Sequence, residues 1–297
     1  MKTRFLTDST FYIDQKFLDE NKIEQIPLII SINDKYYYED QFDLKQKEEI
    51  FSLINTEKKL PNTSQPTLDS YLQKFEKLEN EGAEKIYLFT VSEHISGTIQ
   101  GAYNASNIYM QSSNVEIKVY DIKQAALAAS LVLMEIIKEF NKNQEISDEK
   151  IEDIISWYET NAHIYLLVDD LKYLAYGGRI PSSIAKIGNV LKIKPIIKIE
   201  AGKMLEFDRA RTRKKAIKII EDQFLNELKQ NPVKHYFGCE ELYALDDAKI
   251  YEQIFIEAAT TEIEKLGIFN FGPTIGAHIG PNTLAFLWAK PYELKND

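Results

Sequence analysis

The stretch KIYLFTVSEHISGTIQGAYNASNIYM, residues 85–110, contains the pattern that decides the fold class. The apolar run from Lys85 to Val91 predicts a buried strand, because it is short and rich in β-branched and aromatic side chains. A polar loop follows it, and Thr98 to Met110 has the spacing of a helix. The same order recurs at Val115 to Tyr120 and Ala125 to Phe140. Strands that alternate with helices in this way favour an α/β fold with a mainly parallel sheet.

The sequence before this stretch extends the pattern. It predicts two helices, Leu44 to Ile54 and Leu68 to Leu78. It also predicts a strand at Arg4 to Leu6, and a hairpin formed by strands at Ile26 to Ile32 and Tyr36 to Tyr38. Together with the strands that follow, these elements make a first α/β layer.

The second half alternates less regularly, and its strands come closer together. One pair, Pro195 to Ile199 and Met204 to Phe207, reads as a hairpin and predicts a mixed or antiparallel sheet. We place the boundary after the helix Glu149 to Glu159, which gives an N-terminal α/β domain of residues 1–160 and a C-terminal α/β domain of residues 161–297. The other predicted elements of this half are strands at Ile164 to Val168, Tyr236 to Leu242, Ile268 to Phe271 and Leu284 to Trp288, a short helix from Asp170, and helices at Ser183 to Leu191, Lys214 to Lys229 and Asp247 to Leu266.

Composition excludes several classes of function. A net charge of -10 argues against nucleic acid as the principal partner, because phosphate binding needs a positive surface. The single cysteine, Cys239, cannot form an intrachain disulfide and leaves too few thiolates for a structural zinc site, so we expect no metal site. Met1 to Thr10 lacks the apolar core of a secretory signal, and no stretch reaches the roughly 18 apolar residues of a transmembrane segment. We therefore expect a cytoplasmic protein.

The segment Thr63-Ser64-Gln65-Pro66-Thr67 stands between two predicted helices. Pro66 fixes its own φ and biases Gln65 toward an extended conformation, which predicts a rigid turn rich in hydroxyl groups. The hydroxyl of Thr63 or Ser64 can donate a hydrogen bond to an anionic ligand group. The alternative is a structural role, in which the segment only caps the following helix.

A second hydroxyl lies in the loop from Ser92 to Thr98, between the predicted strand and helix. Amides and hydroxyls converge at such a helix N-terminus, where anions are favoured. Ser96 supplies a donor without formal charge, and Gly97 lets a ligand or another backbone come close. The alternative is that Ser96 serves only as the helix cap.

The second half contains arginines and a histidine that are candidates for contact with a ligand. Gly177-Gly178-Arg179 fits neither a dinucleotide fingerprint nor a phosphate-binding loop, so no nucleotide cofactor is expected. Arg179 can pair bidentately with a carboxylate or a phosphate, and the alternative is that it is only solvated or salt-bridged. Three arginines at 209, 211 and 213 precede a helix, where the dipole disfavours positive charge, and an anion or partner contact would explain them. His278 lies between Gly276 and Gly280, in a segment poorly suited to regular packing, and is the histidine most suited to face a ligand.

These segments, taken in order across nearly the whole chain, resemble the DegV family of bacterial fatty-acid-binding proteins. No single piece carries that resemblance. Two places depart from the family pattern, Glu93-His94 before the serine and Asn282-Thr283 after Gly280-Pro281. The matching segments are Thr7-Asp8-Ser9, Thr63 to Thr67, Ser96-Gly97-Thr98, Gly177-Gly178-Arg179-Ile180, Ile193-Lys194-Pro195, Arg211-Thr212 and Gly276-Ala277-His278.

The resemblance implies two α/β domains that hold a long-chain fatty acid between or within them, without any other cofactor. It implies that Thr63 and Ser96 bind the carboxylate. Some family members are the non-catalytic, lipid-binding subunit of a fatty acid kinase and present the carboxylate to a separate ATP-binding subunit, which makes an acyl phosphate; transient membrane contact is compatible with this role. The residues expected on the head-group or partner side are Arg179, Arg211, His278 and Ser64.

Two other functions compete with this expectation. One is an acyl hydrolase with Ser96 as nucleophile and His278 as base. It is disfavoured because Ser96 does not lie in a Gly-x-Ser-x-Gly turn and no acid is paired with His278 in the sequence. The other is a scaffold with an incidental pocket, which would be purified without lipid.

Overall fold

The computed structural model describes residues 2–32, 35–39, 48–50, 52, 60–180 and 193–296. The predicted helix at Ser183 to Leu191 lies outside these residues, and so does most of the one at Leu44 to Ile54. Contacts along the chain define two compact units, one of Met1–Glu48 and Pro61–Ile155, the other of Glu49–Leu60 and Ser156–Asp297. The domain boundary expected at residue 160 stays a prediction.

The first unit is built on a four-stranded sheet in which all neighbouring strands are parallel, in the order β2-β1-β6-β7. Parallel pairing requires crossovers, and the intervening segments supply them as helices. This confirms the expected mainly parallel sheet. The strands are β1 (Thr3–Asp8), β2 (Ile23–Ile26), β6 (Lys85–Thr90) and β7 (Glu116–Asp121); the helices are α1 (Gln15–Asn21), α3 (Leu68–Asn80), α4 (Thr98–Tyr109), α5 (Ala126–Asn143) and α6 (Asp148–Asn161), whose last turns belong to the second unit.

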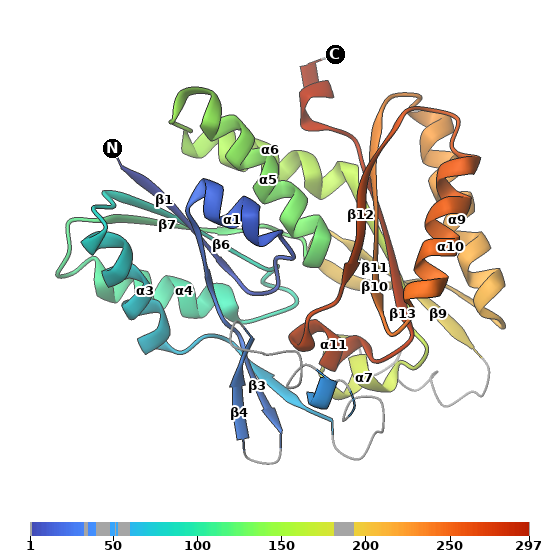
Figure 1. Ribbon diagram of the computed structural model, residues 1–297, viewed down its shortest axis with the longest axis horizontal. Coiled ribbons are helices and arrows are strands. Elements are labelled where there is room, and N and C mark those ends of the chain that lie inside the picture. The colour runs from blue at the N-terminus through green and yellow to red at the C-terminus, as the bar shows by residue number, and fades with distance from the viewer. Residues whose placement is uncertain are drawn as a thin grey trace. The chain divides into compact units, whose positions relative to one another are not determined.

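Apolar side chains cover both faces of this sheet, because successive residues of a strand point to opposite sides. Leu88 of β6 packs with Tyr71 of α3 and Ala102 of α4 on one face. On the other face, Phe5 of β1 meets Phe140 of α5 edge-on, with ring centroids 4.9 Å apart. Figure 1 shows the strands between these helices. The buried strand predicted from residue 85 therefore lies inside the sheet.

A small antiparallel sheet, in the order β4-β3-β5, extends from the first unit. It contains β3 (Ile29–Ile32), β4 (Lys35–Tyr38) and β5 (Asn62–Ser64). The pairing of β3 with β4 confirms the predicted hairpin. The single strand predicted over residues 26–32 was wrong, because β2 ends at residue 26 and β3 begins in a different sheet. Pro27 lies at the break. It has no N–H group, so it cannot donate a hydrogen bond to a neighbouring strand.

The second unit contains a six-stranded sheet in the order β10-β9-β8-β13-β11-β12. Only β11 and β12 are parallel, so the sheet is mixed, as predicted. The predicted hairpin forms β9 and β10. The strands are β8 (Ala162–Leu167), β9 (Lys194–Glu200), β10 (Lys203–Ala210), β11 (His235–Leu242), β12 (Ile263–Asn270) and β13 (Thr283–Ala289).

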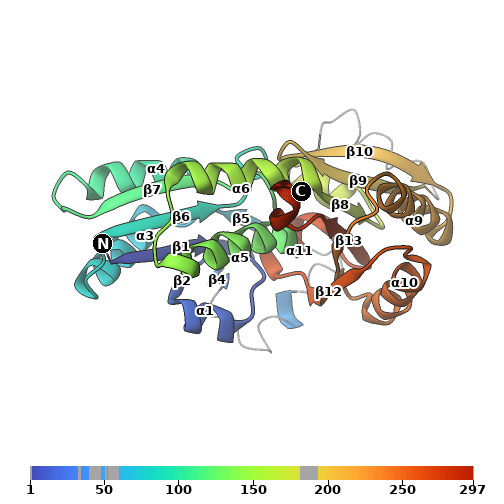
Figure 2. The ribbon, with the colours of Figure 1, turned by 90° about the horizontal axis from the view of Figure 1, so that it is seen from above.

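Helices α9 (Arg213–Gln230) and α10 (Leu245–Ala258) cover one face of this sheet (Figure 2). The rings of Phe224 of α9 and Phe255 of α10 lie tilted against each other, with their centroids 5.6 Å apart. The helix predicted over Asp247 to Leu266 was too long. Its last residues belong to β12 because they pair with β11 along the full strand.

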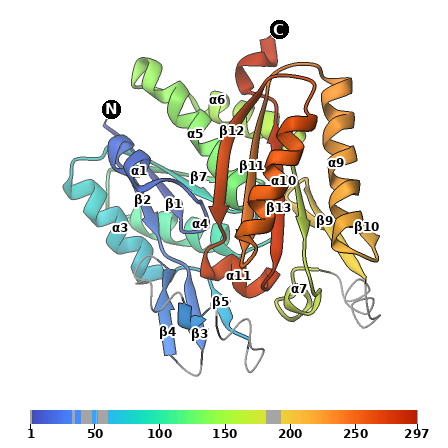
Figure 3. The same cartoon turned by 45° about the vertical axis from the view of Figure 1, so that its right-hand side comes forward.

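Two short helices lie together at one end of the sheet (Figure 3). They are α7 (Lys172–Tyr176), which was predicted, and α11 (Pro273–Ile279), which was not. A 3₁₀ helix, η3 (Tyr292–Asn296), ends the described chain. Within the described ranges, no helix combines the length and the apolar character needed to cross a bilayer.

Candidate functional site

Residues 63–67, which we call the hydroxyl segment, run from β5 into α3. The structure corrects the prediction that they form a turn between helices, because Thr63 belongs to β5 and is paired with Ile30 of β3. Main-chain pairing therefore fixes the position of Thr63. Ser64 is exposed, whereas Thr63 is half-buried. At the other end, Thr67 caps α3 as predicted: its hydroxyl accepts a hydrogen bond from the Ser70 amide at 3.1 Å.

Residues 91–97, the serine loop, connect β6 with α4. The Ser96 amide donates to the Ser92 carbonyl at 3.0 Å, which folds the loop back on itself. The Ser96 hydroxyl lies 2.8 Å from the Thr98 hydroxyl and accepts a long 3.3 Å bond from the Thr98 amide. The N-cap position belongs to Gly97, and no side chain caps α4 from there. A half-buried hydroxyl thus stands at a helix N-terminus, where an anion is favoured.

The side chain of Gln65 brings the two segments together. A Cβ atom built at Gly97 would lie 3.4 Å from Oε1 of Gln65, and one built at Gly101 would lie 3.1 Å from it. The Gln65 amide therefore lies directly on the first turn of α4. The structure places the hydroxyl segment of Thr63 beside the serine loop of Ser96, although about thirty residues separate them in the sequence.

Asp8 holds the base of the serine loop. Its carboxylate is fully buried at the end of β1 and accepts hydrogen bonds from the Val91 amide at 2.8 Å and the Thr10 amide at 2.9 Å. Burial raises the pKa of Asp8 despite these bonds. The phenol of Tyr71 donates to the Thr98 carbonyl at 3.1 Å and fixes the far end of the loop. Sequence reasoning gave Asp8 no role; its only signal was its place in the matching Thr7-Asp8-Ser9 segment.

A second cluster joins α7 to α11 in the other unit. A Cβ atom at Gly177 would lie 2.1 Å from Nδ1 of His278, so the imidazole packs directly on this glycine. Nη1 of Arg179 donates to the Gly177 carbonyl, and burial lowers the pKa of the guanidinium. The structure thus brings together two segments that the sequence had marked separately. It also corrects the expected irregular surroundings of His278, which lies in the last turn of helix α11.

His278 is held in its neutral form. Burial, together with the positive charge of Arg179, lowers the pKa of His278 to about 3. The unfolded chain, with a histidine pKa of about 6.5, binds this proton more readily than the folded chain does. The contribution of neutral His278 to the free energy of unfolding is therefore complete above pH 6.5 and is lost as the pH falls toward 3. Between pH 7 and 5 this single group should cost about 2 kcal/mol of stability.

We expect the variant His278→Asn to lose less stability on acidification than the wild type. The test is urea unfolding of both proteins at pH 7 and pH 5, with the free energies compared between variants at each pH. The comparison cancels the titration of all other groups, including His163, whose pKa is also lowered by burial. Equal losses in the two proteins would show that folded His278 accepts a proton in this range.

The arginines at 209, 211 and 213, the last of which begins α9, have different surroundings. Arg209 pairs with Glu206 at 3.0 Å, and Arg213 pairs with Asp247 at 2.7 Å, so neither needs an anion or a partner. Arg211 is exposed and has no hydrogen bond or ion pair with any residue in the described ranges. Of the three, only Arg211 fits the predicted contact with a ligand or partner.

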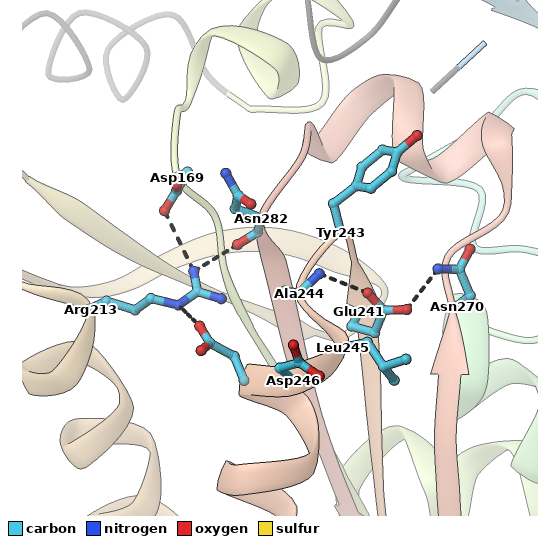
Figure 4. A pocket seen from close by; sticks show the side chains of 10 residues that line it. Asp169, Arg213, Glu241, Tyr243, Ala244, Leu245, Asp246, Asn270 and Asn282 are labelled. Carbon is cyan, nitrogen blue, oxygen red and sulfur yellow. Dashed lines mark hydrogen bonds and ion pairs between the residues drawn. The ribbon is translucent and has the colours of Figure 1, made fainter. Parts of the chain in front are cut away.

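A pocket that the sequence did not predict lies beside Arg213 (Figure 4). It has a volume of about 670 Å³ and opens at the end of β11, within the second unit. Four of its ten lining residues are acidic, so we call it the acidic pocket. Its walls consist of Asp169, Arg213, Glu241, Tyr243, Ala244, Leu245, Asp246, Asp247, Asn270 and Asn282.

Most of these acids are already engaged by the protein itself. Lys194 binds Asp169 at 2.8 Å. The two oxygens of Glu241 accept hydrogen bonds from Asn270 at 2.7 Å and from the Ala244 amide at 2.9 Å, which ties the start of α10 to the end of β12. In the described part of the chain, no group of three or more His, Cys, Asp or Glu side chains is arranged to hold a metal ion. Most acidic side chains of this pocket therefore have a structural role, because their bonds hold neighbouring segments together.

The geometry of Ser96 gives no support to a hydrolase. Among the described residues, its hydroxyl hydrogen-bonds only with the hydroxyl and the amide of Thr98, and not with a histidine or a carboxylate. A serine nucleophile needs a base within hydrogen-bonding distance.

Comparison with known proteins decides the family. A family model described as "Uncharacterised protein, DegV family" matches residues 2–291 of the chain. The chain belongs to the DegV family. This DegV chain is 28% identical over 284 residues to a DegV domain-containing protein of Staphylococcus aureus (strain COL), with 96% of each chain covered.

Solved DegV structures share the fold. The chain resembles DegV, a fatty acid binding protein from Bacillus subtilis, with a TM-score of 0.83 and 26% identity over 98% of this chain and 100% of that one. A stearic acid-binding protein from Eubacterium ventriosum has a TM-score of 0.85 over 98% of this chain and 99% of its own, at 21% identity. Both relatives are fatty-acid-binding proteins, and the likeness to the second shows the common fold.

Proposed function

We propose that this DegV chain binds one long-chain fatty acid and holds its carboxylate with the hydroxyls of Thr63 and Ser96. The observation that carries the proposal is the contact of Gln65 with Gly97 and Gly101, which places the two hydroxyl-bearing segments side by side at the N-terminus of α4. Neutral donors at a helix N-terminus suit a carboxylate. The fatty acids bound by the Bacillus subtilis and Eubacterium ventriosum relatives support the same ligand class.

Burial of the acyl chain supplies most of the affinity. About fifteen methylenes at about 0.8 kcal/mol each give a gross term of about 12 kcal/mol, before the cost of immobilising the ligand. The two hydroxyl contacts contribute less than the acyl chain, and they select the end of the ligand that carries the charge. We therefore expect a bound lipid to survive purification.

We further propose that the protein is not itself a catalyst and presents the carboxylate to a separate ATP-binding kinase subunit in the cytoplasm. Arg211 and Ser64 are exposed, and Arg211 makes no bond within the described chain, so both are available to a partner. Arg179 and the neutral His278 are the other two residues that we propose for the head-group or partner side.

Mass spectrometry tests the proposal. The protein is measured under native conditions and again after denaturation and solvent extraction, and we expect one long-chain fatty acid per chain. In a second arm, the loaded protein is mixed with the kinase subunit and ATP, and acyl phosphate is trapped with hydroxylamine. A lipid-free protein that also refuses added fatty acid would refute the binding role; a loaded protein that gives no hydroxamate would refute only the presentation role.

A further inference from the structure

Two glycines lie at the start of α4. Gly97 is its N-cap, a position that glycine favours, and has a φ of -75°. Gly101 lies inside the helix, and it is not one of the positive-φ positions of the described chain. Inside a helix, a glycine is less favourable than alanine by about 1 kcal/mol. The presence of Gly101 therefore points to a close approach by another group.

The approaching group is the amide of Gln65. Positions 97 and 101 are four residues apart, so they share one face of the helix and form a flat surface that we call the glycine seat. An added Cβ at Gly101 would lie 3.1 Å from Oε1 and 3.3 Å from Cδ of Gln65, which is tighter than ordinary contact. The seat is thus shaped for the end of this side chain.

Packing, and not hydrogen bonding, keeps Gln65 on the seat. The side chain is exposed and has no hydrogen bond to any described residue. Its backbone is anchored on both sides, by the pairing of Ser64 with Ile29 in the small sheet and by the buried Pro66, which favours an extended Gln65. In an extended chain, residues two apart point to the same side, so we expect the side chain of Thr63 to face the same way as that of Gln65.

We infer that Gln65 on the glycine seat is a positioning residue, which sets the distance between the Thr63 and Ser96 hydroxyls and so determines selectivity for a carboxylate head group. The inference rests on the proposed function. Small displacements of hydrogen-bond donors weaken binding steeply, because these bonds tolerate only a few tenths of an ångström. Gln65 acts through Thr63 and need not touch the ligand.

The test measures binding of palmitic acid and of 1-hexadecanol, a neutral ligand of equal length, to the lipid-stripped full chain. We expect Gln65→Ala and Gly101→Ala each to weaken palmitate binding by about tenfold, equivalent to one hydrogen bond, and to leave hexadecanol binding unchanged. Gly101→Ala should also keep or raise the melting temperature, since alanine favours the helix. The double variant should bind palmitate no more weakly than Gln65→Ala.

Conservative and matched variants complete the design. Gln65→Met keeps the length of the side chain without the amide, so it should bind palmitate like the wild type. Gln100→Ala, on the same helix, removes an exposed glutamine side chain that, among the described residues, hydrogen-bonds only to Asn104, and it should leave palmitate binding unchanged. Unchanged palmitate binding in both Gln65→Ala and Gly101→Ala would overturn the inference, and so would a loss in Gln65→Met. A wild type that does not prefer palmitate to hexadecanol would instead overturn the proposed function.

Discussion

The double variant Thr63→Ala plus Ser96→Ala should lose fatty acid affinity by a factor of about 10² to 10⁴. A hydrogen bond to a charged group contributes about 1.5–3 kcal/mol, and the variant removes two of them. Binding is measured by titration of the lipid-stripped protein with palmitic acid. The apolar chain still contributes, so weak association should remain, whereas the preference over 1-hexadecanol should vanish.

A matched pair of substitutions controls for the loss of hydroxyl groups as such. Ser112→Ala plus Thr260→Ala removes the same two types of side chain at exposed positions that follow α4 and α10. It should bind palmitate like the wild type. The assignment of the carboxylate to Thr63 and Ser96 would have to be abandoned if the two double variants bound palmitate equally well while both remained folded by circular dichroism.

Gly280→Ala should lower the free energy of unfolding by about 2 to 6 kcal/mol. Gly280 ends α11 at φ 75° and ψ 170°, a region open almost only to glycine, and occupying it with alanine costs about 1–3 kcal/mol. A Cβ there would also lie 2.3 Å from the ring of Tyr173, which is only 2% exposed and has little room to move. Such overpacking costs about a further 1–3 kcal/mol. Denaturant unfolding measures the loss.

Gly178→Ala separates backbone strain from the clash. Gly178 has a positive φ of 69°, yet a Cβ there would meet nothing within 4 Å. This variant should lose only about 1 to 2 kcal/mol, the cost of a left-handed alanine. If Gly178→Ala and Gly280→Ala were equally destabilised, the close packing of Tyr173 on Gly280 would be wrong.

The sequence predicts the parts of this fold that depend on local patterns. Lys85 to Val91 is apolar along its length, and Thr67 stands one residue before a helix, so β6 and the cap of α3 follow from neighbouring residues. The hairpins and the mixed second sheet follow similarly. Helix α11 carried readable signals too, Pro273 at its start and Gly280 at its end, which are typical helix boundaries.

The candidate site was only partly predictable, because its contacts join distant segments. Thr63 and Ser96 were singled out for their hydroxyls, but nothing local shows that Gln65 lies on Gly101. The packing of His278 against Gly177 likewise spans about a hundred residues. The role of Asp8 depends on its bond to Val91, the first residue after the neighbouring strand β6. Such pairings depend on the order of strands in the sheet, and the hydrophobic periodicity of the sequence does not reveal that order.

The pairing of Thr63 with Ile30 in the small sheet has a consequence for how such a protein can diversify. Main-chain pairing holds the backbone that carries this hydroxyl, and that pairing does not depend on the sizes of the apolar side chains in the core. Exchanging large for small apolar residues elsewhere in the unit leaves the ladder intact. The preferred length of the ligand can therefore change in evolution while the position of the Thr63 hydroxyl stays constant. Chain-length preference and head-group binding are thus separable targets for engineering.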